Sequence, residues 1–127
     1  MLLSIIVPTY NESKNITPFV EAITSTIKSK DYEIIFVDDN STDKTYKIVN
    51  DISYKLNRVR CIRRIGRRGL SSAVIEGCLS SSSKFLLVMD ADLQHDEKKI
   101  PEMISLMKQE ELDLVVGSRF LYKSKTT

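Results

Sequence analysis

The sequence predicts an α/β fold with three layers, α/β/α, and a mainly parallel sheet. Short β-branched apolar runs alternate with amphipathic stretches along the chain, which is typical of strands joined by helices. The apolar runs are nearly continuous, as in strands that are buried on both faces of a parallel sheet. A chain of 127 residues is short enough for one hydrophobic core, so we expect a single domain.

Five strands and four helices are expected, in alternation from an N-terminal strand to a C-terminal strand. Crossovers between parallel strands are right-handed, and each helix should therefore cover a face of the sheet. The strands correspond to the apolar runs at residues 3–7, 32–37, 59–62, 85–89 and 112–116.

Amphipathic stretches with helical spacing lie between the strands. The first has one apolar stripe at positions i, i+3, i+4, i+7 and i+11, formed by Ile16, Phe19, Val20, Ile23 and Ile27. The second helix is expected to begin with Ser41 or Thr42 as its N-cap and to have Asp43 in its first turn. The third covers residues 70–79 and the fourth covers residues 100–107.

Composition and charge exclude several classes of protein. Nineteen Lys and Arg against seventeen Asp and Glu give a formal net charge of +2. This charge is too small for a protein whose whole surface binds nucleic acid. No apolar run approaches the ~20 residues of a membrane-spanning helix, and the first residues lack the features of a signal peptide. Cys61 and Cys78 fit no metal or disulfide pattern and are interpreted as reduced core residues. We therefore expect a cytoplasmic protein that binds no nucleic acid.

Polar motifs follow four of the predicted strands. They are Pro-Thr-Tyr-Asn-Glu at 8–12, Asp-Asp-Asn-Ser-Thr-Asp at 38–43, Asp-Ala-Asp-Leu-Gln-His at 90–95 and Gly-Ser-Arg at 117–119. Ligands of open parallel sheets bind at the carboxyl ends of the strands, so these motifs should converge on one edge. Three acidic clusters and an arginine mark the expected site.

Asp90 and Asp92 are the centre of this expected site. In an extended segment, residues two apart point to the same side, roughly 7 Å apart along the chain. Two carboxylates on one face favour a divalent cation such as Mg²⁺ or Mn²⁺, and the amide oxygen of Gln94 is a further candidate ligand. A solvated acidic loop is the alternative for Asp-x-Asp alone, but the position directly after a buried strand favours the metal.

Asp38 and Asp39 end the second strand and must point to opposite faces. One would face the crevice and accept hydrogen bonds from a base or ribose while the other caps the following turn, although capping by both fits the residues equally well. Six arginines lie within residues 58–68. They form a solvated strand edge, or Arg67 or Arg68, beside glycines, meets phosphate or an anionic lipid surface.

Five motifs resemble, in order, those of the inverting family 2 glycosyltransferases, most closely the dolichol- or polyprenol-phosphate mannosyltransferases. They are VPTYNE at 7–12, VDDNSTD at 37–43, GLSSA at 69–73, DADLQH at 90–95 and GSR at 117–119. The resemblance implies a Rossmann-like GT-A fold over residues 1–122, followed by a frayed tail at 123–127. It also implies a nucleotide-diphosphate sugar donor, with GDP-mannose favoured over UDP-glucose.

The resemblance implies a role for each matching residue. The nucleoside pocket would be lined by Pro8, Tyr10, Glu12, Val37 and Asp39. The diphosphate side would be formed by Asp90, Ala91 and Asp92, and the metal, Mg²⁺ or Mn²⁺, would be held by Asp90, Asp92 and Gln94. Arg119 would reach a donor phosphate or the transferring sugar, so Asp92 and Arg119 are the implied catalytic residues.

The implied reaction moves mannose from GDP-mannose onto a polyprenyl or dolichyl phosphate by a single displacement with inversion. Family members continue well beyond the Gly-Ser-Arg motif, so the resemblance implies a C-terminally truncated domain or a partner chain that supplies the remaining half. A lipid acceptor implies contact with the cytoplasmic face of a membrane. The alternative is a nucleotide-sugar-binding module without transferase activity of its own.

Overall fold

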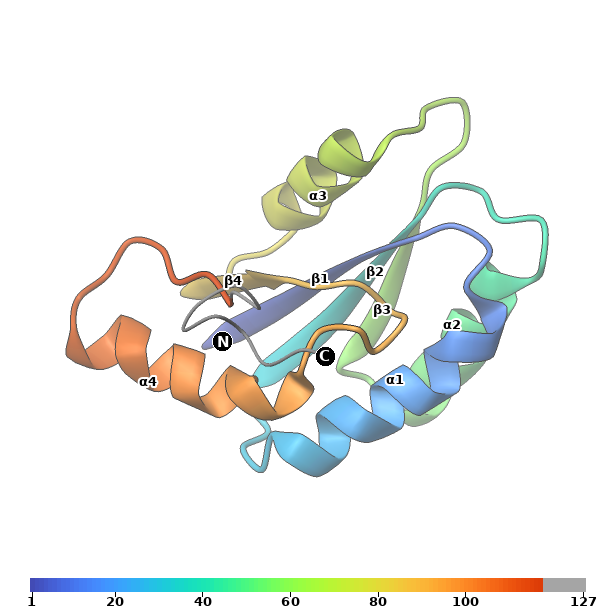
Figure 1. The fold of residues 1–127 in the computed structure, drawn as a ribbon. Helices are drawn as coiled ribbons and strands as arrows, with labels where there is room; N and C mark the ends of the chain where they lie inside the picture. Colours follow the sequence, from blue (N-terminus) through green and yellow to red (C-terminus); the bar gives the residue numbers. More distant parts are fainter. Residues whose placement is uncertain (118–127) are drawn as a thin grey trace, which may run out of the picture. The chain divides into compact units, whose positions relative to one another are not determined.

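The computed structural model describes residues 1–117 of the chain. The chain divides into two compact units, Met1–His95 and Asp96–Thr127. The first unit contains a four-stranded sheet and the helices α1, α2 and α3, and in the second a 3₁₀ turn precedes helix α4 (Figure 1). Within residues 1–117, every helix is too short or too polar to cross a membrane.

The sheet consists of β1 (Leu3–Thr9), β2 (Tyr32–Asp38), β3 (Val59–Arg63) and β4 (Phe85–Val88) in the order β3-β2-β1-β4. All three strand pairs are parallel, as the apolar runs predict. The central strands are almost completely buried because helices cover both faces. In contrast, β4 alternates between half-buried and exposed residues, as expected of an edge strand.

Helices lie on both sides of the sheet, which confirms the three layers. Helices α1 (Ser13–Thr26) and α2 (Thr45–Lys55) lie on one side and α3 (Leu70–Leu79) lies on the other (Figure 1). The predicted apolar stripe of α1 faces the sheet, where Phe19 contacts Phe36 edge-on with ring centroids 5.8 Å apart. On the opposite side, Ala73 of α3 packs in a buried cluster with residues of β1 and β2.

Helix α3 approaches the sheet closely at Gly77. A Cβ atom at this position would lie 2.5 Å from Cγ2 of Ile6 and 2.9 Å from Cγ2 of Val37. Both of these side chains are fully buried in the sheet. The contact therefore requires a residue without a side chain, and it sets the distance between α3 and the central strands.

Two sequence predictions about boundaries are wrong. Helix α2 begins at Thr45, preceded by Lys44 in a left-handed conformation, so Ser41 and Thr42 are not its N-cap. Their side chains and that of Asp43 bind segments elsewhere in the chain, which the local pattern does not reveal. The run at 85–89 is a strand only as far as Val88, although the Met89 N–H still donates to the Ile6 carbonyl.

The predicted strand at residues 112–116 is also wrong, since these residues have no regular structure. A strand exists only when a neighbour supplies its hydrogen bonds, and within residues 1–117 no strand pairs with this run. Leu114 and Val116 are accordingly exposed. The fourth helix, by comparison, is confirmed as α4 (Ile100–Gln109), with a proline in its first turn.

The close approach at Gly77 generates a stability prediction. We expect Gly77→Ala to lower the free energy of unfolding by about 1–3 kcal/mol, because the added methyl group overpacks a core that cannot yield easily. Urea unfolding measures this difference. Ser71→Ala, an exposed change on the same helix, is the control and should alter stability by less than about 0.5 kcal/mol. Equal stability of the two variants would contradict the close packing of α3.

Candidate functional site

The strand order creates a switch point at the carboxyl ends of β1 and β4. From β1 the chain passes through α1 to β2 on one side, whereas α3 leads to β4 on the other side of β1. In open parallel sheets the crevice that binds ligands forms at such a point. Because Ile6 pairs with Val88, the segment that begins at Asp90 leaves the sheet beside the end of β1.

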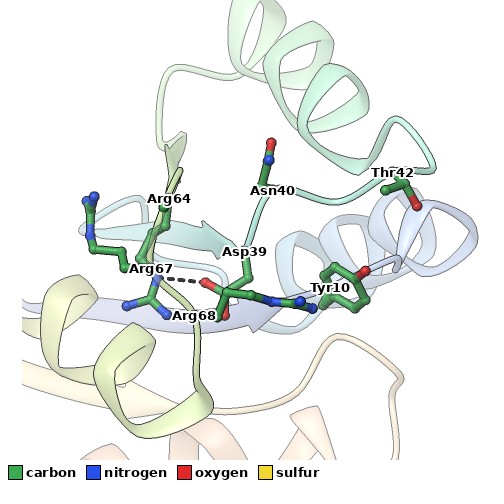
Figure 2. Close-up of a pocket in the computed structure, with 8 residues that line it drawn as sticks. Tyr10, Asp39, Asn40, Thr42, Arg64, Arg67 and Arg68 are labelled. Carbon is green, nitrogen blue, oxygen red and sulfur yellow. Dashed lines mark hydrogen bonds and ion pairs between the residues drawn. The ribbon is translucent and has the colours of Figure 1, made fainter.

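A pocket of about 480 Å³ lies at the carboxyl ends of β1, β2 and β3 (Figure 2). This volume is within the range of small-molecule sites. Three loops contribute the lining residues, which are Tyr10, Asp39, Asn40, Thr42, Arg64, Gly66, Arg67 and Arg68. The pocket therefore combines an aromatic ring, one carboxylate and three guanidinium groups.

The adjacent acids at the end of β2 have different roles. Asp38 is fully buried, and its carboxylate accepts hydrogen bonds from Thr9 Oγ1 at 2.8 Å and from the Ser41 N–H and Oγ at 2.9 and 2.6 Å. These bonds hold the turn that follows β2. Asp39 points to the other side and lines the pocket, so the two residues divide the roles of turn cap and pocket carboxylate between them.

Both oxygens of Asp39 are held by the segment that follows β3. Arg64 Nε donates to Oδ1 at 2.6 Å, and the Gly69 N–H donates to Oδ2 at 3.0 Å. Partial burial opposes ionisation of Asp39, but the bonds from Arg64 and Gly69 outweigh it, so the pKa of Asp39 is lowered. Asp39 therefore faces the pocket as an ionised group that accepts hydrogen bonds.

Arg64 is the residue that sequence reasoning missed. Its side chain is 1% exposed, yet it is charged and bonded to Asp39, Ser72 Oγ, Glu76 Oε2 and the Gly69 carbonyl, at 2.6–3.3 Å. Glu76 is also paired with Arg67, whose hydrogen bond is the main reason that the pKa of Glu76 falls to about 2. The sequence signal was an arginine directly after a strand, but five other arginines nearby concealed it.

Arg68 and Tyr10 form one wall of the pocket. The Arg68 guanidinium lies 4.8 Å from the centre of the Tyr10 ring, within cation–π range. Figure 2 places both side chains beside Asp39. Among residues 1–117, no carboxylate pairs with Arg68, whereas Arg67 is bound to Glu76. Of the two arginines that the sequence suggests for anion binding, Arg68 is the one whose charge is not already paired.

The turn after β1 is attached to the loop after β2. The N–H groups of Asn11, Glu12 and Ser13 donate to Ser41 Oγ at 2.8 Å, Thr45 Oγ1 at 3.0 Å and Asp43 Oδ2 at 3.1 Å, respectively. These bonds satisfy the free N–H groups at the start of α1 from another segment of the chain. They also fix Tyr10 and Asp39 on neighbouring loops. The Glu12 side chain accepts from the Asn15 amide at 2.7 Å.

The Asp90–Asp92 segment turns instead of continuing as a strand. Ala91 and Asp92 form a turn, and Leu93 has a left-handed φ of 61°. Asp92 Oδ1 accepts from the Gln94 N–H at 3.1 Å, and the Asp90 N–H donates to His95 Nδ1 at 3.2 Å. The extended alternation expected here is therefore wrong. Both carboxylates are nonetheless exposed, and Ala91 between them is buried.

The remaining predicted site residues have varied positions. Pro8 is half-buried in β1, and the side chain of Val37 is buried in the core against α3. Among the described residues, those that line the pocket do not include Pro8, Glu12, Val37, Asp90, Ala91 or Asp92. Arg119 and the expected tail at 123–127 lie outside the described residues, and the roles implied for all of these positions stay predictions.

Cys61 and Cys78 are free thiols, as the sequence suggests. Burial, together with the charge of Asp38, raises the pKa of Cys61 to about 12, and burial also raises the pKa of Cys78. Because the thiolate is the reactive form, neither residue is an activated nucleophile.

Comparison with known proteins identifies the family. A family model described as "Glycosyl transferase family 2" matches residues 4–127. The chain belongs to glycosyl transferase family 2. The chain is 41% identical over 125 residues to a dolichol-phosphate mannosyltransferase of Pyrococcus furiosus and 37% identical over 120 residues to that of Saccharomyces cerevisiae. These matches cover 98% and 92% of this chain, but only 35% and 44% of the two relatives.

Solved structures of other proteins share this fold. The mannosyltransferase PcManGT from Pyrobaculum calidifontis, solved in complex with GDP-Man and Mn²⁺, matches 83% of this chain and 32% of its own, with a TM-score of 0.74 and 23% identity. The TarS 1–349 structure from S. aureus matches 87% of this chain and 33% of its own, with a TM-score of 0.75 and 26% identity. These matches confirm the GT-A fold.

The carboxylates around Arg64 generate a prediction of pH dependence. The pKa values of Asp39 and Glu76 are lower in the folded chain than the ordinary values near 4, so their contribution to stability is complete above the ordinary value. We expect the free energy of unfolding to be constant between about pH 5 and 8 and to fall as the pH decreases from about 4.5 to 2. Urea unfolding across this range measures the slope.

Two variants test the source of this pH dependence. Glu76→Gln should destabilise the chain at neutral pH and make the acid slope shallower, because Glu76 no longer binds a proton on acid unfolding. Asp51→Asn removes an exposed pair with Lys47 and should leave the slope unchanged. An identical slope in Glu76→Gln and the unmodified chain would rule out this explanation.

Proposed function

We propose that this chain binds the nucleotide-sugar donor of a mannosyltransferase, and that the whole protein moves mannose from GDP-mannose to a polyprenyl or dolichyl phosphate with inversion. The 41% identity to a dolichol-phosphate mannosyltransferase over 98% of this chain carries the proposal. Because the chain spans less than half of the relatives' length, the acceptor and the transfer step belong to the proposal.

The pocket at the end of β1–β3 has the chemistry that a nucleoside diphosphate requires. Asp39 supplies ionised oxygens for the N–H or O–H donors of a base or ribose, and the ring of Tyr10 supplies an apolar surface. The guanidinium of Arg68, which pairs with no carboxylate among residues 1–117, suits a phosphate. GDP-mannose is the donor we favour, and UDP-glucose is the alternative.

Asp90 and Asp92 fit a hard divalent cation. They are exposed carboxylates on the β4 side of the switch point, and among residues 1–117 neither is paired with Lys or Arg. Two carboxylates and the amide oxygen of Gln94 would leave positions for water and phosphate oxygens, as Mg²⁺ and Mn²⁺ prefer. A metal bound here supplies Lewis-acid stabilisation of the departing diphosphate. The Pyrobaculum structure was solved with Mn²⁺, and we assign Mg²⁺ or Mn²⁺ to this chain.

The acceptor accounts for the absence of a proposed catalytic base. A lipid phosphate is already largely anionic near neutral pH because its second pKa is ~6, so it can attack the sugar without transferring a proton to the protein. Arg119 is assigned to the donor phosphate or the sugar. The lipid acceptor places the protein at the cytoplasmic face of a membrane, and residues beyond this chain, or a partner chain, would complete the acceptor side.

Calorimetry of the chain with GDP-mannose tests the donor site. We expect binding with Mn²⁺ present and at least about tenfold weaker binding with EDTA, because the carboxylates of Asp90 and Asp92 repel the diphosphate without a cation. Asp92→Ala should abolish this dependence on metal. Asp96→Ala removes a nearby acid whose carboxylate accepts from the Lys98 N–H, and this variant should bind like the unmodified chain. If the affinity for GDP-mannose is the same with Mn²⁺, with EDTA and in Asp92→Ala, the proposed metal site is refuted.

A transfer assay separates the enzyme from a binding module. The chain is incubated with radiolabelled GDP-mannose, Mn²⁺ and a polyprenyl phosphate, and lipid-extractable label is counted. If this chain is sufficient for transfer, product forms and disappears with Asp92→Ala. Metal-dependent donor binding without product would identify the alternative function, a nucleotide-sugar-binding module that requires further residues for transfer. Absence of donor binding would contradict both functions.

A further inference from the structure

Arg64 is an unusual residue for the floor of a pocket. Long charged side chains are almost never fully buried unless they are paired, and the Arg64 side chain is 1% exposed. Its Nε, Nη1 and Nη2 atoms all donate hydrogen bonds to acceptors on the flanking segments. Burial of a charged guanidinium away from water is unfavourable, so it requires hydrogen bonds such as these to compensate for the lost hydration.

The contacts of Arg64 connect the pocket carboxylate to α3. Nε binds Asp39 on the pocket side, while Nη1 binds Ser72 Oγ at 2.9 Å and Glu76 Oε2 at 3.3 Å on the helix. Nη2 binds the Gly69 carbonyl at 2.9 Å, and the Gly69 N–H returns to Asp39. One oxygen of Asp39 is therefore held by the Arg64 guanidinium (Figure 2), and the other is held by the backbone N–H of Gly69, whose carbonyl binds the same guanidinium.

We propose that Arg64 is a positioning residue of the donor site, which orients the Asp39 carboxylate toward the ligand without contacting the ligand itself. The identity of the ligand in this inference rests on the proposed function, whereas the effect of Arg64 on Asp39 does not. The planar guanidinium holds Asp39 and α3 in a fixed relative geometry, because its N–H donors have fixed directions. A lysine ammonium group has no such fixed fork of donors. Arg64 thus couples donor binding to the position of the β3–α3 segment, which also places Arg68 beside the pocket.

The groups around Asp39 determine the direction in which its pKa should change when Arg64 is removed. Arg64 and Arg68 favour the ionised form, as does the Gly69 N–H, whereas partial burial opposes it. Glu76 contacts Arg64, and its negative charge is also paired with Arg67. Removal of Arg64 alone leaves the desolvation in place and takes away the strongest compensating contact. The pKa of Asp39 should then rise, as expected when a carboxylate loses an adjacent cation.

Carbon-13 NMR titration of the Asp39 carboxyl in the full chain tests the effect without a ligand. In Arg64→Met we expect the midpoint to move upward, and in Arg64→Lys, which keeps a charge, most of the shift should be absent. Arg60→Met is the matched control, because Arg60 forms its ion pair with Glu33, at 2.8 Å. This control should leave the Asp39 midpoint unchanged. An unshifted midpoint in Arg64→Met would overturn the proposal.

Calorimetry with GDP-mannose and Mn²⁺ between pH 4.5 and 8 tests the effect on binding. The diphosphate of this ligand is esterified at both ends and does not titrate in the range. The Kd of the unmodified chain should show no titration of Asp39, whereas the Kd of Arg64→Met should increase by up to about tenfold per pH unit below the raised pKa. A merely structural role would weaken binding equally at every pH.

The remaining outcomes also decide the question. Arg64→Lys should bind the donor more weakly than the unmodified chain at pH 7.5 although Asp39 stays ionised, because the fork that orients the carboxylate is lost. If Arg64→Met does not fold, the Arg64→Lys variant alone tests the proposal. Unchanged donor affinity in Arg64→Lys would overturn it. If the unmodified chain binds no GDP-mannose, the proposed function fails, while the NMR titration still tests the action of Arg64 on Asp39.

Discussion

The pocket depends on the ion pair between Asp39 and Arg64. Asp39 follows β2 and Arg64 follows β3, so the pair joins the carboxyl ends of two neighbouring strands where backbone pairing stops. Replacing a buried pair as a whole is often tolerated, but loss of one partner leaves an uncompensated charge in a poorly solvated place. The pair therefore connects the loops that follow β2 and β3 at the pocket.

The apolar sheet and the polar loops have separate tasks. Nearly continuous burial of β1 and β2 provides the core, and the strand order of the sheet places the carboxyl ends of β1 and β4 at a switch point. The loops then present unlike chemistry at one edge. The aromatic ring, the carboxylate and the arginines gather at the ends of β1–β3, while the exposed acids Asp90 and Asp92 follow β4. This division suits a ligand with a nucleoside at one end and a metal-bound diphosphate at the other.

The local backbone of these loops requires particular residue types. Asn11 and Asn40 have left-handed φ values of 53° and 56°, and asparagine is one of the few residues with a side chain that adopts this region readily. The Asn11 side chain accepts from the Thr42 N–H at 2.9 Å, and Asn40 accepts from Arg63 Nε at 3.1 Å. The same residues therefore permit the turns and connect them. Tyr10 and Asp39 are positioned as a result of these bonds.

Residue patterns alone predict the α/β fold, the first four strands, the helix that covers residues 13–26 and the edge on which Tyr10, Asp39 and Asp90 lie. These features follow from apolar periodicity and from the rule that parallel strands end together, and both are local or topological. Contacts between distant segments are needed to explain why residues 112–116 form no strand, why α2 begins at Thr45 and why Arg64, among six arginines, holds Asp39. Those outcomes depend on which distant segment supplies a hydrogen-bond partner, and no repeat along the chain encodes that choice.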